Sequence, residues 1–134
     1  MMRAATCLPA LLAAVVACQA PDTSAAAKAA IDAANANWPR LTSSGHADSL
    51  AEFYAADGML MPPNMPTVRG KDSIRAFFAV LNEAKPTLTI RAETVIARGD
   101  VAVERGRWVF TWAPGTVPPG APASDSGKYI VRWT

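Results

Sequence analysis

The chain has 134 residues, with 13 Lys and Arg against 11 Asp and Glu. This length is typical of one domain, and the near-balanced charge excludes the strongly basic surface of a nucleic-acid-binding protein. Four Trp, four Phe and two Tyr supply large apolar side chains for a core and exclude a chain that is disordered throughout.

Residues 1–17 have the features of a secretory signal peptide. Fourteen of them are hydrophobic, Arg3 carries the only charge, and an apolar run extends from residue 8 to residue 17. The run is too short to span a bilayer, which requires about 20 apolar residues. The segment from Val15 to Cys18 resembles the lipobox of bacterial lipoproteins, which implies cleavage before Cys18 and acylation of that cysteine. The alternative is an ordinary signal peptide, cleaved near Ala20.

A lipid on Cys18 would leave the mature chain without a free thiol, because Cys7 leaves with the leader. We expect residues 18–27, which are mostly small and polar, to form a tether to a folded domain over residues 28–134. The lipoprotein resemblance, with Gln19 after the cysteine, favours the outer membrane, on its periplasmic side in a Gram-negative cell. An ordinary signal peptide would instead give a secreted or soluble periplasmic protein.

The first helix is predicted over residues 24–43. Apolar side chains recur there at helical spacing and form one face: Ile31, Ala34, Trp38 and Leu41. Asn35 falls outside this face. Pro39 disfavours an uninterrupted helix, so the helix either kinks there or Pro39 opens a separate last turn.

Two further helices follow. The first spans about residues 47–56, with Asp48 or Ser49 as its N-cap. His46, the only histidine, stands at its start, where we expect a solvated capping position rather than a catalytic one. The helix over residues 71–83 carries apolar residues at positions i, i+3, i+4 and i+7, which is the pattern of an amphipathic helix.

The remaining elements are strands. A short strand is predicted over residues 59–61, and period-two patterns predict strands over residues 87–97, 101–112 and 127–134. A loop rich in Pro, Gly, Ala and Ser covers residues 113–126. One face of the strand over residues 101–112 presents Ala102, Glu104, Gly106, Trp108, Phe110 and Trp112. One face of the last strand presents Tyr129, Val131 and Trp133.

Four blocks of sequence then occur in an order that carries a resemblance. After Gly45 they are LAEFYAADGMLMPP (50–63), VRGKDSIRAFF (68–78), GDVAVERG (99–106) and GKYIVRW (127–133). They resemble the NTF2-like superfamily, and most closely its DUF4440/SnoaL-like branch, which is related to ketosteroid isomerase. The resemblance implies an α+β cone, in which a curved antiparallel sheet wraps around about three helices and leaves an apolar pocket at the open end. It also implies a homodimer through the sheet and one further strand, which we expect this chain to lack.

Glu104 is the one carboxylate that we single out for chemistry. If its strand face lines the cone, burial favours a role as an acid, a base or a ligand anchor. The alternative is a structural ion pair with Arg69 or Arg107, because an unpaired buried carboxylate is costly. Ketosteroid isomerases use a carboxylate base near the end of the first strand. The matching residues 59–63 contain none, which counts against isomerase chemistry.

Six side chains are expected to line a ligand pocket: Trp38, Tyr54, Met61, Glu104, Trp108 and Tyr129. Taken singly, each aromatic residue and Met61 is better explained by core packing than by a pocket. Arg69 precedes the third helix and fits either an anion site or a brace to backbone or Asp57. One His and no free Cys argue against zinc or copper, and no phosphate-binding glycine loop occurs, so we expect no metal and no cofactor.

Three functions fit these observations. The first is a membrane-tethered cell-envelope domain that binds a small apolar ligand or a partner without chemistry of its own. The second is an isomerase, lyase or hydrolase of the same fold, acting on a small lipophilic substrate with Glu104 as acid or base. The third is a subunit whose exposed sheet face mediates assembly.

Overall fold

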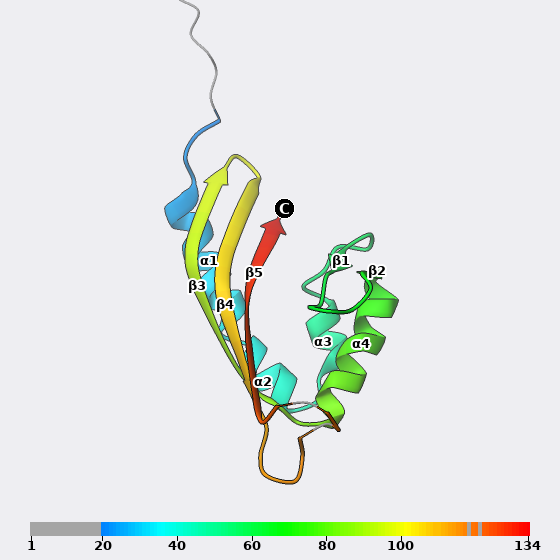
Figure 1. Ribbon diagram of the computed structural model, residues 1–134. Coiled ribbons are helices and arrows are strands. Elements are labelled where there is room, and N and C mark those ends of the chain that lie inside the picture. The colour runs from blue at the N-terminus through cyan, green and yellow to red at the C-terminus, as the bar shows by residue number, and fades with distance from the viewer. Residues whose placement is uncertain (1–19, 118, 121) are drawn as a thin grey trace, which may run out of the picture.

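Four helices and two antiparallel sheets make up residues 20–117, 119–120 and 122–134, which are the part of the chain that this computed structural model describes (Figure 1). The predicted signal peptide and Cys18 lie outside these residues. In chain order the elements are α1 (Ser24–Asn35), α2 (Trp38–Ser43), α3 (Ala47–Ala51), β1 (Met59–Leu60), β2 (Val68–Arg69), α4 (Lys71–Glu83), β3 (Thr87–Arg98), β4 (Val101–Thr111) and β5 (Ser124–Trp133). The predicted α+β class is confirmed.

The helix predicted over residues 24–43 is in fact two helices, α1 and α2. Pro39 lies in the first turn of α2, where its missing N–H leaves no hydrogen bond unmade, so the second of the two alternatives holds. The buried residues of α1 are Ile31 and Asn35, one turn apart on the same side. The placement of Asn35 outside the buried face is therefore wrong, because α1 packs on β3 with the side that carries Ile31 and Asn35.

The middle of the chain differs from its prediction in two details. Helix α3 ends at Ala51, and His46 occupies its N-cap position. Among the described residues, neither His46 nor the two predicted caps makes a side-chain capping hydrogen bond. Asp48 instead pairs with Arg75 of α4, with an N–O distance of 2.7 Å. Strand β2 was not predicted, because two residues are too few for a periodic pattern, and it pairs with β1.

The larger sheet has the order β3-β4-β5, and both of its pairings are antiparallel. A bulge at Glu93 shifts the register of β3 against β4. Strand β5 begins at Ser124, three residues earlier than predicted, and lies at the sheet edge without a further neighbour among the described residues. The inward face predicted for β4 is confirmed, since Ala102, Glu104 and Gly106 are buried and their neighbours are exposed.

Two aromatic rings of this sheet lie over glycines of the neighbouring strand. Tyr129 of β5 stands opposite Gly106, and Trp108 of β4 stands opposite Gly127. A Cβ at Gly106 would lie 2.4 Å from the Tyr129 ring, and one at Gly127 would lie 2.6 Å from the Trp108 ring. Both positions therefore require glycine for space.

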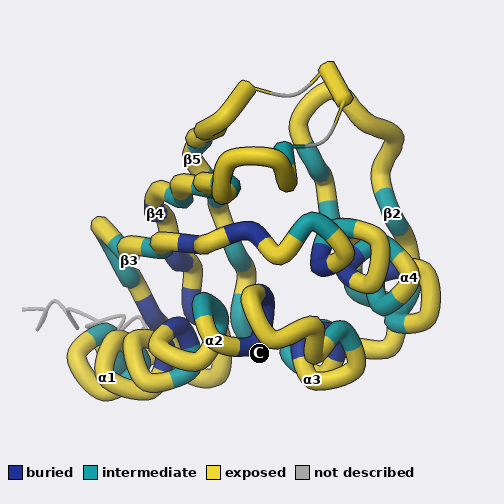
Figure 2. Tube along the Cα trace, turned by 90° about the horizontal axis from the view of Figure 1, so that it is seen from below, coloured by how far each residue is buried: buried dark blue, intermediate teal, exposed yellow. Residues whose placement is uncertain are grey.

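The buried apolar residues form two clusters, and Figure 2 marks the buried parts of the chain. The first lies among the helices and contains Leu41, Leu50, Ile74 and Phe78. The second contains Ile31, Ala97 and Ala102, where α1 packs on the hairpin of β3 and β4. Helices α1 and α2 pack against β3, whereas α3, α4, β1 and β2 form a second layer that diverges from β5 (Figure 1). No described helix is long and apolar enough to cross a membrane.

Candidate functional site

The carboxylate of Glu104 is fully buried and accepts three hydrogen bonds. Asn35 Nδ2 of α1 and the Tyr129 hydroxyl of β5 each donate to Oε1 over 2.6 Å. Trp133 Nε1, also of β5, donates to Oε2 over 2.9 Å. We call these four residues the Glu104 cradle. The cradle connects the central strand to α1 and to the edge strand through polar contacts.

All three donors of the cradle are neutral side chains. Burial raises the pKa of Tyr129 well above its ordinary range, and the hydrogen bond to Glu104 raises that pKa further, so Tyr129 stays a phenol donor at physiological pH. Since both carboxylate oxygens have donors, the desolvation cost of the buried group is offset by hydrogen bonds rather than by a counter-ion.

The ion pair proposed for Glu104 is wrong. Arg107 lies on the opposite face of β4, where it pairs with the bulged Glu93 over 2.6 Å. Arg69 belongs to β2 and donates to the sulfur of Met59 on the paired strand β1. Period-two alternation places Arg107 and Glu104 on different faces of β4, and Arg69 lies in the separate sheet of β1 and β2.

Two open grooves flank α1 on either side of the cradle. The first, of about 300 Å³, is called the Asn35 groove and is lined by Asp32, Asn35, Ala36, Pro39, Ile90, Arg91 and Ala92. The second, of about 350 Å³, is called the Trp133 groove. It lies between α1, the turn after β3 and the end of β5, and is lined by Ala27, Ala30, Ile31, Ala34, Ala97, Gly99, Asp100, Val101, Ala102, Trp133 and Thr134. Each groove therefore contains one donor of the cradle.

Of the six predicted pocket residues, four meet in two separate pairs, and none of the six lines either groove. Glu104 and Tyr129 meet in the cradle. Trp38 and Tyr54 meet in the helical cluster with their ring centroids 6.3 Å apart, and burial raises the pKa of Tyr54 to about 12. Trp108 packs against Phe110 on the same face of β4 as Glu104, with a centroid separation of 5.2 Å. Met61 follows β1 and is 71% exposed.

Sequence reasoning missed two members of the site, Asn35 and Trp133. Trp133 shares a predicted strand face with Tyr129, so the signal was present, but it becomes a partner of Glu104 only in the observed register of β5 on β4. Asn35 lies one helical turn after Ile31, and this spacing was the available signal.

The position of Glu104 is unfavourable for acid–base chemistry on a substrate. Glu104 has no exposed surface, and a substrate could reach its oxygens only by displacing a donor. Within the described ranges, no group of three or more His, Cys, Asp and Glu side chains is placed to hold a metal ion. The Trp133 groove instead offers apolar walls with one indole fixed by its hydrogen bond.

Comparison with known proteins extends these observations. The family model of the SnoaL-like domain matches residues 27–134. No curated protein matches the chain.

Three solved structures share the fold. A Xanthomonas campestris protein described as a calcium/calmodulin-dependent protein kinase II association domain has a TM-score of 0.63 and 24% identity, over 76% of this chain and 72% of that one. A ketosteroid isomerase-like protein from Erwinia carotovora atroseptica has a TM-score of 0.56 and 21% identity, over 76% and 77%. An NTF2-like protein with a cystatin-like fold from Novosphingobium aromaticivorans has a TM-score of 0.55 and 21% identity, over 81% and 72%. At these identities the likeness establishes the NTF2-like fold.

Proposed function

Because the chain belongs to the SnoaL-like domain family, we propose that it is a membrane-tethered cell-envelope domain of this family that binds a small apolar ligand. The observation that carries the binding proposal is the Trp133 groove, with its volume of about 350 Å³ and its alanine, isoleucine and valine walls. Ligand sites for small molecules are mostly apolar, with a few fixed polar groups, and begin at about 300 Å³. On the four sequence blocks we place the chain in the DUF4440/SnoaL-like branch.

The tether is supported by the apolar leader and the segment from Val15 to Cys18. Acylation at Cys18 with more than one chain gives stable anchoring, since a single chain holds a protein only marginally. The test is fractionation of cells that express the full chain or its Cys18→Ser variant. We expect the full chain in the membrane fraction and the variant in the soluble fraction. Equal membrane retention of the two would refute the lipid anchor.

Ligand binding is tested with Nile red, an apolar dye whose fluorescence rises in apolar surroundings. Ala30 and Ala33 are both exposed alanines of α1, and only Ala30 lines the Trp133 groove. We expect Ala30→Trp to fill the groove and abolish the fluorescence gain, and Ala33→Trp to retain it. The same loss in both variants, or in neither, would contradict binding in this groove.

The catalytic alternative, an isomerase, lyase or hydrolase with Glu104 as acid or base, rests on the phenol–carboxylate contact between Tyr129 and Glu104. Its test is Glu104→Gln, which keeps the shape of the side chain and removes its acidity. A lipophilic substrate that is turned over by the wild type and not by the folded variant would favour the enzyme.

A further inference from the structure

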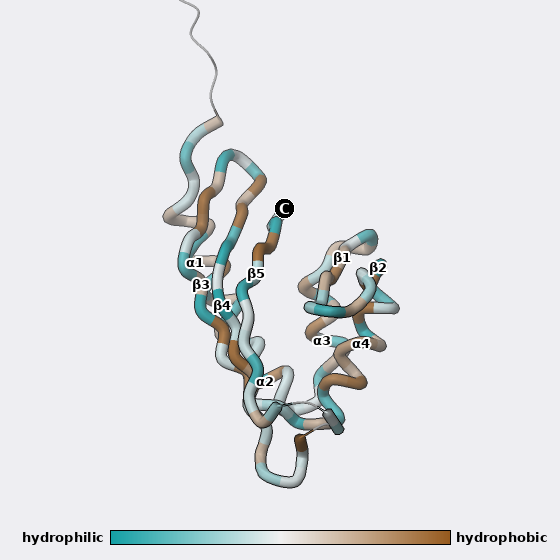
Figure 3. Tube along the Cα trace, in the orientation of Figure 1, coloured by the Kyte–Doolittle hydropathy of each residue, from teal (hydrophilic) through white to brown (hydrophobic). Residues whose placement is uncertain are grey.

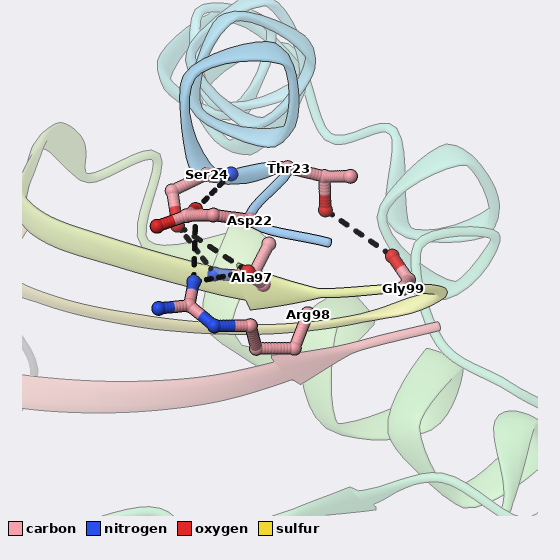
Figure 4. A network of polar contacts seen from close by, with 6 residues as sticks. All are labelled: Asp22, Thr23, Ser24, Ala97, Arg98 and Gly99. Atoms are coloured by element: carbon pink, nitrogen blue, oxygen red, sulfur yellow. Dashed lines mark hydrogen bonds and ion pairs between the residues drawn. The ribbon is translucent and has the colours of Figure 1, made fainter. Parts of the chain in front are cut away.

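The N-terminal end of the described chain is fixed to the turn between β3 and β4 (Figure 4). Asp22 pairs with Arg98 over 2.8 Å, and the Ser24 hydroxyl accepts a hydrogen bond from the Ala97 N–H over 2.8 Å. The Thr23 hydroxyl donates to the Gly99 carbonyl over 3.3 Å. An isolated bridge between Asp22 and Arg98 aligns the segment with β3. The chain is therefore held to the domain from about residue 22 onward.

We call these contacts between residues 22–24 and residues 97–99 the clamp, and they leave only a short connection to the proposed anchor at Cys18. Three residues, 19–21, separate Cys18 from Asp22. Four Cα–Cα steps reach at most about 14 Å even when fully extended. The turn at Gly99 and Asp100 thus has to stay close to any membrane that holds a lipid on Cys18. We call this end of the sheet the hairpin pole.

The opposite end of the sheet is far from the clamp. Strand β4 runs from Val101 at the hairpin pole to Thr111, and at about 3.3 Å per residue its two ends are roughly 33 Å apart. The connection between β4 and β5 lies at this distal end (Figure 1). A short tether therefore gives the two ends very different distances from the membrane.

The hairpin pole combines hydrophobic residues near the ends of β3 and β4 with hydrophilic residues in the turn between them (Figure 3). The inner side holds the Trp133 groove. The outer side exposes Ile96, Val101 and Val103, with exposed fractions of 57%, 37% and 44%. Further along the outer face charged and apolar side chains are mixed, with Glu93 paired to Arg107 and with Val109 and Ile130 exposed. Exposed apolar side chains at the hairpin pole can be buried at the boundary of a lipid bilayer, where charges stay in water.

We propose that the domain stands on its membrane with the hairpin pole against the lipid surface, so that the Trp133 groove opens toward the bilayer and takes an apolar ligand from it. The proposal rests on the proposed lipid anchor and adds the orientation and the source of the ligand. The occupant of the exposed apolar face is the membrane itself. The clamp, the length of the connection and the position of the apolar surface all point to the same end of the molecule.

The test places a photoreactive benzophenone amino acid in the full chain, at Asp100 or at Thr116, and irradiates isolated membranes. Asp100 lies in the turn of the hairpin pole and Thr116 in the distal connection. We expect mass spectrometry to detect lipid adducts with the probe at position 100 and none with the probe at position 116. Equal labelling at the two positions, stronger labelling at 116, or adducts at position 100 to a second copy of the chain instead of lipid would each overturn the orientation.

A matched pair of valines tests the apolar contact. Val103 and Val109 lie on the same face of β4, are 44% and 37% exposed, and do not line the Trp133 groove. With the probe at Thr134, which lines that groove, we expect Val103→Asp to reduce lipid adducts and Val109→Asp to leave them unchanged. Equal effects of the two would overturn the contact. Membrane retention of Cys18→Ser would refute the anchor alone, because the photoadducts report orientation independently, and absence of the wild type from membranes would overturn both.

Discussion

Replacement of Glu104 should separate the contribution of its hydrogen bonds from that of its shape. In Glu104→Leu, the Asn35 amide, the Tyr129 hydroxyl and the Trp133 indole all lose their acceptor. A buried donor without a partner costs about 1–3 kcal/mol. Tyr129 and Trp133 are partly exposed, so their donors can form hydrogen bonds with water instead. We therefore expect a loss of about 3–5 kcal/mol in the free energy of unfolding.

Glu104→Gln should cost less than Glu104→Leu. Its carbonyl oxygen keeps the two bonds from Asn35 and Tyr129, whereas its amide nitrogen turns a donor toward Trp133 Nε1. One hydrogen bond is exchanged for a donor–donor contact, which we expect to cost about 1–3 kcal/mol. Trp133→Phe removes that conflict, so it should be clearly less harmful in the Gln background than in the wild type. The coupling between the two substitutions should be about 1 kcal/mol or more.

Urea unfolding followed by far-UV circular dichroism measures these differences. The Gln variant keeps the experiment interpretable if the Leu variant does not fold, since a domain has only about 5–15 kcal/mol of stability. A cost of Glu104→Leu below that of Glu104→Gln, or a coupling of zero between positions 104 and 133, would refute the assignment of a shared polar cradle.

Three further outcomes are expected. Tyr54 has a folded pKa of about 12 against an ordinary 10.0, so the stability that its neutral form provides is complete below pH 10 and is lost as the pH rises toward 12, by up to about 3 kcal/mol. The difference between the thermal midpoints at pH 9 and pH 11, read by circular dichroism, should be smaller in Tyr54→Phe than in the wild type. It should be smallest when Tyr129→Phe is added, because the raised pKa of Tyr129 contributes a loss of the same sign; an unchanged difference in Tyr54→Phe would contradict the burial of that phenol. Gly106→Ala should lose about 3 kcal/mol because its Cβ would lie 2.4 Å from both the Tyr129 ring and the backbone oxygen of Arg91. A Tyr129→Ala background should relieve only part of this loss, since the Arg91 oxygen stays in place, and urea unfolding of the four variants measures the part that is relieved; no relief at all would contradict the contact with the ring. Asn82, 5% exposed, has an amide without a hydrogen-bond partner among the described residues, so Asn82→Leu should leave the urea midpoint unchanged or raise it, and a marked fall would mean that the amide has a partner.

The periodic parts of the sequence predicted the fold well. Helix α4 begins and ends where its apolar spacing indicates, and the alternation of β4 identified the face on which Glu104 is buried. These predictions succeeded because one period extends over ten or more residues in each element. The two-residue strand β2 and the bulge at Glu93 have no periodic signature, since each depends on which segment lies beside it.

The candidate site was predictable only in part. Glu104 and Tyr129 were chosen from their strand faces, but their contact depends on the register between β4 and β5, which a long connection does not determine. The expected arginine partner was wrong because a positive charge nearby in sequence lies on the other face of the same strand. Asn35 is 69 positions from Glu104, and only the packing of α1 on the sheet brings them together.

The aromatic rings over glycines have a consequence for how the edge strand finds its place. A slip of β5 by one residue would turn Tyr129 to the outer face, and a slip by two would set its ring against a side chain in place of the hydrogen of Gly106. Trp108 would lose its space over Gly127 in the same movement. The two ring–glycine pairs, with one ring from each strand, therefore select a single register of β5 on β4. In that register the Tyr129 hydroxyl and the Trp133 indole both reach the carboxylate of Glu104.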